Sequence, residues 1–177
     1  MVKILNNCCS PTYLDCLKDI AANAENWNIK YPLNTPIEKK FLKLEIVGGG
    51  GVQHPVLAGL ALGLLHQIYE SGGQDLFSPE MYFCGISIKD KHRPDNIHTD
   101  KLDTDRKIVK IVGLLNSDWK EEWGGGFIHN ETNNYIKPTS FCVFDASEEH
   151  GSSEIFTDKK RFAIDFAVFV EPPQDIN

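Results

Sequence analysis

Short apolar runs separated by polar turns fill the chain from about residue 76 onward. The runs are rich in the β-branched and aromatic residues that strands favour, and they read MYFCGISIK, KIVKIVGLLN, GGFIHN, NYIKP, SFCVFD, SEIFT and RFAIDFAVFV. Together with the stretch around NIHTD they predict about eight strands in roughly ninety residues. Because no helical pattern lies among them, we expect antiparallel strands that close into a sandwich or jelly roll.

Helical signals dominate the first 75 or so residues. Ser10 and Pro11 stand in the order of a helix cap and a first helical residue. Apolar positions then follow on one face for about four turns, at Leu14, Leu17, Ile20, Ala21 and Ala24. A second helix start is indicated by Thr35 and Glu38, which have the spacing of a capping box, and the helix that it opens is short.

The clearest helical pattern runs from about His54 to Ser71, and the pair Gly72-Gly73 ends it. Its apolar residues repeat at intervals of three and four, at Leu57, Leu60, Ala61, Leu64, Leu65 and Ile68. We expect this stripe to pack on a sheet. The preceding segment GGGGVQHP, residues 48–55, lacks the Gly-Lys-Ser/Thr ending of a phosphate-binding loop, so we interpret it as a connector.

Length, composition and charge fit one globular domain with a small partner. The 177 residues are 41% hydrophobic, which is enough to bury a core. We therefore expect a single domain over residues 1–177, with a helical region at 1–75, a β core at 76–171 and a tail at 172–177. The net charge of −7 argues against nucleic acid as a partner, because phosphates require clustered Lys and Arg. A small molecule or a peptide is the expected partner.

The cysteines and the N-terminus bear on the compartment. Five cysteines at irregular spacing suit neither a disulfide framework nor a CxxC metal site, so they indicate free thiols. The N-terminal MVKILNNCCSP has no signal-peptide core, and no apolar run reaches the ~20 residues that cross a membrane. We therefore expect a soluble cytoplasmic protein that does not bind a membrane.

Candidate chemistry begins with HTD, residues 98–100, in a polar segment between two predicted strands. Residues two apart on an extended backbone project to the same side, so His98 and Asp100 could reach one ion together. Taken alone, the triplet suits a solvated loop better than a metal site, because two ligands do not make a site. His150, which follows the predicted strand SFCVFD, is the best third ligand. Two histidines and one carboxylate form the facial triad of non-haem Fe(II) oxygenases.

Arg161 opens the most apolar predicted strand, eleven residues after His150. Alternation places Arg161 on one face of that strand together with Ala163, Asp165 and Ala167. An inward arginine with small neighbours has room to pair bidentately with a carboxylate. A pair with Asp165 on the same face, or a solvated arginine at the strand edge, is the structural alternative.

In this order the motifs resemble the Fe(II)- and 2-oxoglutarate-dependent oxygenases, specifically their prolyl 4-hydroxylase-like branch. The resemblance covers residues 81–170 and rests on HTD, IVGLLNSDWKEEWGGGF, IKPTSFCVFDASEEHGSS and KKRFAIDF. It implies that His98, Asp100 and His150 bind Fe(II) and that Arg161 holds the distal carboxylate of 2-oxoglutarate, the co-substrate used with O2. It also implies a mainly β fold, a double-stranded β-helix (jelly roll) with N-terminal helices packed on the major sheet.

Some positions depart from the family pattern or admit alternatives. Prolyl hydroxylases often place a tyrosine where this chain has Leu114, and the interval after His150 is about a residue longer than in many relatives, so Lys160 is an alternative to Arg161. Tyr82 could supply a hydroxyl to the co-substrate pocket or belong to the core. His129 is an alternative metal ligand. Trp119 and Trp123 suit either a substrate groove or core packing.

The expected function is hydroxylation of an unactivated C–H bond. Peptidyl or free proline is the nearest substrate by resemblance, and other amino acids or small metabolites stay open. The competing hypothesis is a non-enzymatic, cupin-like jelly-roll module in which the triad binds a structural ion or nothing. A cupin-like metalloenzyme of another chemistry is a third, and it predicts metal binding without dependence on 2-oxoglutarate.

Overall fold

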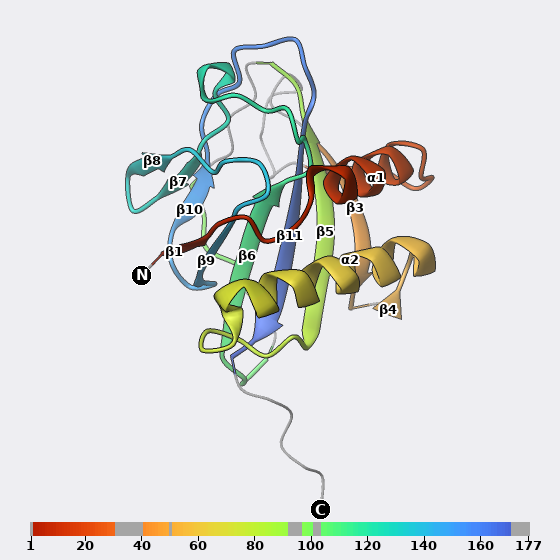
Figure 1. Ribbon diagram of the computed structural model, residues 1–177, viewed down its shortest axis with the longest axis vertical. Coiled ribbons are helices and arrows are strands. Elements are labelled where there is room, and N and C mark those ends of the chain that lie inside the picture. The colour runs from red at the N-terminus through yellow and green to blue at the C-terminus, as the bar shows by residue number, and fades with distance from the viewer. Residues whose placement is uncertain (1, 31–40, 50, 92–96, 101–103, 171–177) are drawn as a thin grey trace, which may run out of the picture.

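The computed structural model describes residues 2–30, 41–49, 51–91, 97–100 and 104–170. Within these residues, one group of strands comprises β1 (Lys3–Leu5), β2 (Asn28–Lys30), β3 (Phe41–Gly48), β4 (Gly51–Val52), β5 (Met81–Lys89), β6 (Ile108–Leu114), β9 (Phe141–Asp145) and β11 (Arg161–Phe169). They form an antiparallel major sheet in the order β1-β9-β6-β11-β5-β3-β2, with β4 also paired to β3 (Figure 1). A second group, β7 (Phe127–His129), β8 (Thr132–Asn134) and β10 (His150–Ser152), forms a minor sheet in the order β10-β7-β8. The expected double-stranded β-helix is confirmed.

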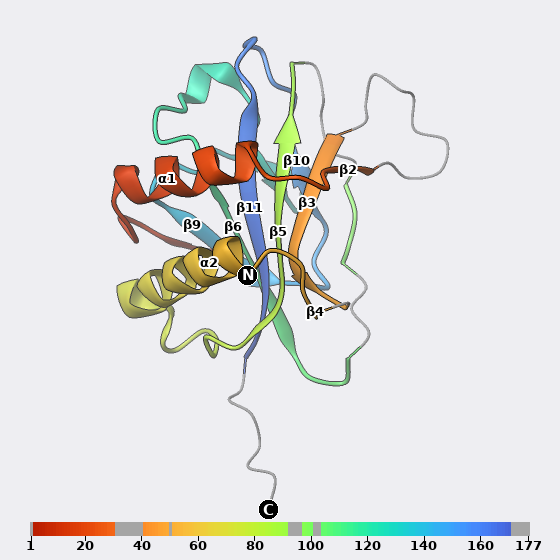
Figure 2. The same cartoon turned by 90° about the vertical axis from the view of Figure 1, so that its right-hand side faces the viewer.

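Two helices cover one face of the major sheet, as Figure 2 shows. They are α1 (Pro11–Ala22) and α2 (Pro55–Ile68), and α2 continues into a π-helical turn at Tyr69–Gly73. The Ser10 hydroxyl accepts a hydrogen bond from the Tyr13 amide at 3.2 Å, so it caps α1 as the sequence predicted. On the opposite face, Phe127 of the minor sheet packs against Phe144 of β9. The expected packing of the helices on the major sheet is confirmed.

Alternation along β11 separates the two layers. The residues of one face, Phe162, Ile164, Phe166 and Val168, are buried in the core cluster that includes both helices. On the other face, Arg161, Ala163 and Asp165 line a cavity on the side of the major sheet that the minor sheet covers. The period-two prediction is confirmed, and this inward face carries the candidate site.

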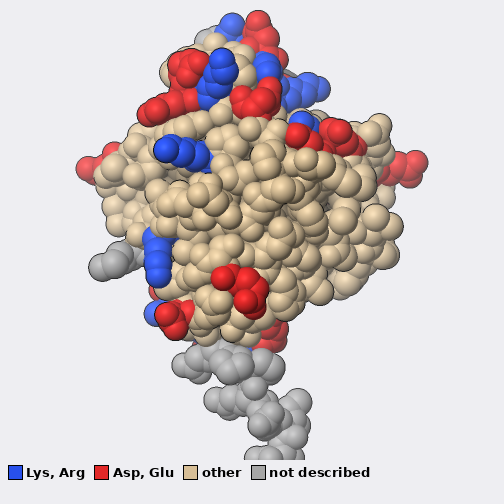
Figure 3. Space-filling view, viewed as in Figure 1, with Lys and Arg blue, Asp and Glu red and all other residues tan. Residues whose placement is uncertain are grey.

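The outer face of the helical layer is poor in charge (Figure 3). Ile20, Val56 and Leu62 are exposed on it. Charged side chains gather instead at one end of the molecule, where the loops before β7 and before β11 lie. No helix in the described part of the chain is long and apolar enough to cross a membrane.

Residues 1–75 contain strands as well as the expected helices. β3 lies between β2 and β5 in the major sheet, and β1 pairs with β9 at the other edge. Gly48 and Gly51 pair within a hairpin of β3 and β4, so the glycine-rich segment is more than a connector. The second predicted helix start, at Thr35, and the predicted tail lie outside the described residues.

The predicted strands of the C-terminal half are mostly confirmed. The bounds of β5 match the run MYFCGISIK, whereas NYIKP and SEIFT do not form strands of their own. β8 ends at Asn134, the first residue of NYIKP, and Ile155 of SEIFT makes only an isolated bridge to Gly124. His150 itself opens a short strand, β10, that the sequence pattern did not indicate.

Candidate metal centre

Backbone pairing brings the HTD segment beside β10. The amide of His98 donates to the carbonyl of His150 at 3.0 Å, and the amide of His150 donates to the carbonyl of His98 at 2.9 Å. Two residues further on, the Asp100 amide donates to the Ala146 carbonyl at 3.1 Å. These bonds hold the segment beside β10 through an isolated bridge, and the side chains of His98 and Asp100 both lie close to the His150 ring.

The three predicted ligands converge on one point. One potential ligand atom of each of His98, Asp100 and His150 lies within 4.8 Å of the other two. His150 Nε2 lies 3.6 Å from Asp100 Oδ2, and His98 Nε2 lies 4.0 Å from Asp100 Oδ1. Among the residues that the structure describes, this is the group of three that can hold a metal ion.

His150 is held in the form that a metal requires. Its Nδ1 lies 3.0 Å from the Glu148 carbonyl, which can only accept, so Nδ1 carries the proton and Nε2 offers its lone pair toward Asp100. Burial lowers the pKa of His150. A neutral imidazole with an oriented Nε2 is the usual state of a metal-bound histidine.

The donor set fits a divalent iron. Two imidazoles and one carboxylate make a facial triad, which leaves further positions for other ligands, whereas structural zinc sites are commonly closed by a fourth protein ligand. His98 and Asp100 border the same cavity as His150, so a small molecule in the cavity has access to the ion position.

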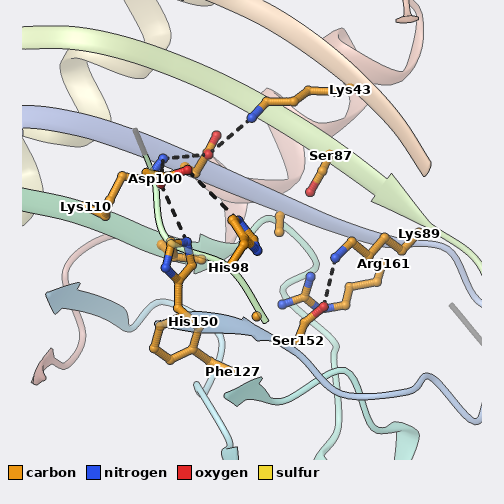
Figure 4. A pocket seen from close by; sticks show the side chains of 14 residues that line it. Lys43, Ser87, Lys89, His98, Asp100, Lys110, Phe127, His150, Ser152 and Arg161 are labelled. Atoms are coloured by element: carbon orange, nitrogen blue, oxygen red, sulfur yellow. Dashed lines mark hydrogen bonds and ion pairs between the residues drawn. The ribbon is translucent and has the colours of Figure 1, made fainter. Parts of the chain in front are cut away.

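Two cationic side chains form the other end of this cavity (Figure 4). Arg161 of β11 and Lys89 of β5 are direct cross-strand partners, and both are less than 5% exposed. The Lys89 ammonium donates to the Ser152 hydroxyl at 2.8 Å. Lys160, the alternative to Arg161, is exposed to solvent. Of the two candidates at the start of β11, the geometry therefore favours Arg161 over Lys160 as the residue that faces the triad cavity.

Asn116 fixes the backbone on both sides of Arg161. Its side-chain amide donates to the Lys160 carbonyl at 3.0 Å and accepts from the Phe162 amide at 2.7 Å. Asn116 is itself buried. These two bonds hold the start of β11 so that Arg161 points inward while Lys160 points out.

A glycine pair covers the stem of Arg161. Gly124 and Gly125 have φ of +72° and +71°, a region that glycine adopts without strain. A Cβ on Gly125 would lie 2.7 Å from Cδ of Arg161. The glycines therefore let the loop before β7 close over the arginine and shield it from solvent.

Comparison with solved structures identifies the architecture. The structure is similar to a prolyl-4-hydroxylase from Pseudomonas putida, with a TM-score of 0.66 and 17% identity over 97% of this chain and 93% of that chain. HygX from Streptomyces hygroscopicus, with nickel and 2-oxoglutarate bound, gives a TM-score of 0.67 and 11% identity over 95% of this chain and 82% of that chain. A prolyl hydroxylase from Trichoplax adhaerens, in complex with a peptide fragment of a hypoxia-inducible factor, gives a TM-score of 0.62. Its sequence identity is 16% over 96% of this chain and 83% of that chain. The fold is that of the 2-oxoglutarate-dependent oxygenases.

At these identities the likeness establishes the oxygenase fold, and the argument about chemistry rests on the residues of the site. No family model matches the sequence, and no curated protein sequence does. Within the oxygenase fold of this chain, the two ends of the cavity are the His-Asp-His triad and the Arg161–Lys89 pair.

Charged residues continue across the cavity floor of this oxygenase fold. Lys110 of β6 lies 3.1 Å from Asp100 Oδ2 and 2.9 Å from Asp165 Oδ2, and Lys43 of β3 lies 3.4 Å from Asp165. Burial alone would raise the pKa of Asp165, but Lys110 and Lys43 together lower it to about 2. Burial likewise opposes the charge of Lys110, yet Asp165 and Asp100 raise its pKa overall. Both side chains are therefore ionised at neutral pH.

Several predicted residues lie away from the cavity. Tyr82 packs edge-on against Phe169, with ring centroids 5.6 Å apart, and does not line the cavity. Tyr82 lies seven residues before Lys89 on β5, and seven residues of extended strand span about 23 Å. Tyr82 is therefore far from the end of β5 that lines the cavity. The prediction that Tyr82 contributes to the co-substrate pocket is therefore not supported by its position.

The remaining aromatic and histidine candidates also have structural roles. His129 Nε2 lies 2.9 Å from a Glu148 carboxylate oxygen, outside the triad. Trp119 is buried and donates from its indole nitrogen to the Gly124 carbonyl at 3.0 Å. Trp123 packs edge-on against it. Leu114 lies in the same apolar cluster as the two tryptophans, so no hydroxyl is supplied from that position.

Lys110 and Asn116 are site residues that sequence reasoning missed. For Lys110, the signal in the sequence was a lysine at an inward position of an apolar strand. A buried lysine requires an anionic partner, so such a position indicates a charged contact inside the protein. Alternation shows that such a lysine faces inward, but its partner depends on strand register, which the pattern does not give.

Proposed function

We propose that the protein is an Fe(II)- and 2-oxoglutarate-dependent dioxygenase that hydroxylates an unactivated C–H bond. The observation that carries the proposal is the union of a His-Asp-His triad and a buried arginine–lysine pair in one cavity. A cation-binding end and an anion-binding end at opposite sides of a small cavity suit a ligand that chelates a metal and ends in a carboxylate.

His98, Asp100 and His150 would hold the iron, and Arg161 would pair with the distal carboxylate of 2-oxoglutarate. Lys89 and Ser152 add a second cation and a hydroxyl at the same end of the cavity. When bound, iron and 2-oxoglutarate supply the oxidising chemistry, in which O2 yields one hydroxyl on the substrate while 2-oxoglutarate leaves as succinate and carbon dioxide.

The chain's own part in this reaction is binding, orientation and exclusion of water. Asn116 and the glycine pair orient Arg161, and the Glu148 carbonyl fixes the proton of His150 on Nδ1. Val112, Phe127 and Ala163 give the cavity apolar walls. A desolvated cavity strengthens the pairing of Arg161 with a carboxylate.

We propose a prolyl 4-hydroxylase-like substrate, a peptidyl or free amino acid. The Trichoplax neighbour was solved with a peptide, which supports a peptide substrate, whereas HygX was solved with hygromycin B, which supports a small molecule. We further propose a cytoplasmic location, supported by five cysteines that are all free.

The test is turnover in a library of peptides, amino acids and small metabolites with Fe(II), 2-oxoglutarate and O2. The proposal predicts succinate in step with a gain of one oxygen atom in the product mass. Metal binding with no succinate under any of these conditions would contradict the proposal and favour one of the two cupin-like alternatives, the binding module or a metalloenzyme of another chemistry.

A further inference from the structure

A chain of four charged side chains leads from the triad along the cavity floor (Figure 4). Asp100 contacts Lys110, Lys110 contacts Asp165, and Asp165 contacts Lys43, at 3.1, 2.9 and 3.4 Å. Each member comes from a different segment: the HTD stretch, β6, β11 and β3. The charges alternate in sign, so both interior members are neutralised from two sides.

Lys110 is the link between the triad and the sheet. Its side chain is 5% exposed and lies between two carboxylates, one of which belongs to the predicted metal ligand Asp100. The cross-strand neighbour of Lys110 on β11 is Ala167, a small residue that leaves room for the lysine stem on the cavity side. A buried ammonium with two fixed anionic partners has little freedom to reorient.

We propose that Lys110 is a positioning residue for the metal centre. By holding Oδ2 of Asp100, it fixes the rotation of that carboxylate within the triad, while Asp165 and Lys43 hold Lys110 in turn. The proposal rests on the proposed function, because the orientation of Asp100 matters only if Asp100 binds the metal.

Two effects of Lys110 on a metal cation oppose each other. Its positive charge repels a second cation, and its contact with Asp100 orients a ligand for that cation. The repulsion is largely cancelled, because the Asp165 carboxylate lies 2.9 Å from the ammonium and carries the opposite charge. We therefore expect orientation to outweigh repulsion, so removal of the ammonium weakens metal binding.

The test measures binding of Co(II) alone to the full chain by calorimetry, together with the melting temperature of the metal-free protein. Lys110→Met should weaken Co(II) binding by about 10- to 100-fold, the usual effect of losing a group that orients a metal ligand. Lys110→Arg, which keeps the charge and can reach both carboxylates, should restore most of the affinity. Lys107→Met is the matched control, because Lys107 is 66% exposed just before the same strand, and it should leave Co(II) affinity unchanged.

The outcomes separate this inference from the proposed function. Co(II) affinity that is equal or higher in Lys110→Met overturns the positioning role, since higher affinity means that repulsion dominates. If Lys110→Met does not fold, the double variant Lys110→Met/Asp165→Asn removes the ammonium together with the carboxylate that offsets its charge, so the net charge of the pair is unchanged. A several-fold loss of Co(II) affinity in this variant supports the role, and an unchanged or higher affinity overturns it. A wild-type protein that binds no Co(II) overturns the proposed function and this inference with it.

Discussion

Arg161 and Lys89 face each other across the β5–β11 pair, and both side chains are buried on the wall of the triad cavity. Like charges that lie directly opposite on neighbouring strands destabilise a sheet unless an anion offsets them. Under the proposed function, the distal carboxylate of 2-oxoglutarate would be such an anion. Binding of the co-substrate should then stabilise this end of the sheet.

Arg161→Ala should weaken 2-oxoglutarate binding by about 100-fold and Lys89→Met by about 10-fold, because charge-assisted hydrogen bonds contribute about 1.5–3 kcal/mol. Calorimetry with Fe(II) in the absence of oxygen measures both dissociation constants. Lys160→Ala, at the exposed neighbour, serves as the control and should bind as the wild type does. An equal loss in Lys160→Ala would show that the register of β11 has been misassigned.

His98→Ala and Asp100→Ala should each abolish turnover and bound iron, because each removes one of the three proposed protein ligands. Iron content after desalting, measured by elemental analysis, checks this without an activity assay. His129→Gln tests the alternative ligand and should keep one iron per chain, since His129 pairs with Glu148 instead. Iron lost from His129→Gln but retained by His98→Ala would reassign the triad.

Asn116→Ala should lower the free energy of unfolding by about 2–3 kcal/mol, because it leaves two buried backbone groups beside Arg161 without their partner. It should also raise the dissociation constant for 2-oxoglutarate, since the start of β11 is no longer held. Urea denaturation gives the first quantity. Asn23→Ala, at the exposed end of α1, is the comparison and should change stability by less than about 0.5 kcal/mol. An Asn116→Ala protein as stable as the wild type would contradict the proposal that Asn116 holds the start of β11.

Asp165→Asn should have a pH-dependent effect on stability. The pKa of Asp165 is lowered to about 2 in the folded protein, so its stabilisation is fully present above about pH 4 and is lost as the pH falls through about 2. Near neutral pH, the free energy of unfolding of the wild type should exceed that of Asp165→Asn by about 2 kcal/mol. At about pH 3 this difference should be smaller by about 1 kcal/mol. Urea denaturation at both pH values measures it. A difference that is constant with pH would mean that the Lys110 and Lys43 pairs contribute nothing through the charge of Asp165.

The alternating pattern predicted the strands that cross the core, because period two is strongest where one face is buried. β5 and β11 illustrate this, and β11 also revealed the inward direction of Arg161. β3 shows the same alternation at Leu42, Leu44 and Ile46, but the helical signals around it led to a helical interpretation of the region. β3 is far from β5 in the sequence and joins the sheet by pairing with it. A local sequence pattern does not predict such non-local pairing.

The triad and Arg161 could be predicted from the sequence, whereas the contacts among the residues around them could not. His98 and Asp100 share a face because they are two residues apart, whereas His150 joins them through a backbone bridge to His98 across 51 intervening residues that only the fold closes. The contacts of Lys110 with Asp165 and Asp100 likewise depend on strand register. Tyr82 lies on β5 but is not among the residues that line the cavity, because a strand of nine residues extends well beyond it.

The most direct test of the central claim is an anaerobic titration of the Fe(II)-loaded protein with 2-oxoglutarate, followed by visible absorption. If the triad holds iron and Arg161 holds the distal carboxylate, a metal-to-ligand charge-transfer band should appear and saturate at one 2-oxoglutarate per chain. The band should be absent in Asp100→Ala and should need much more 2-oxoglutarate in Arg161→Ala. No band in the iron-loaded wild type would contradict the account.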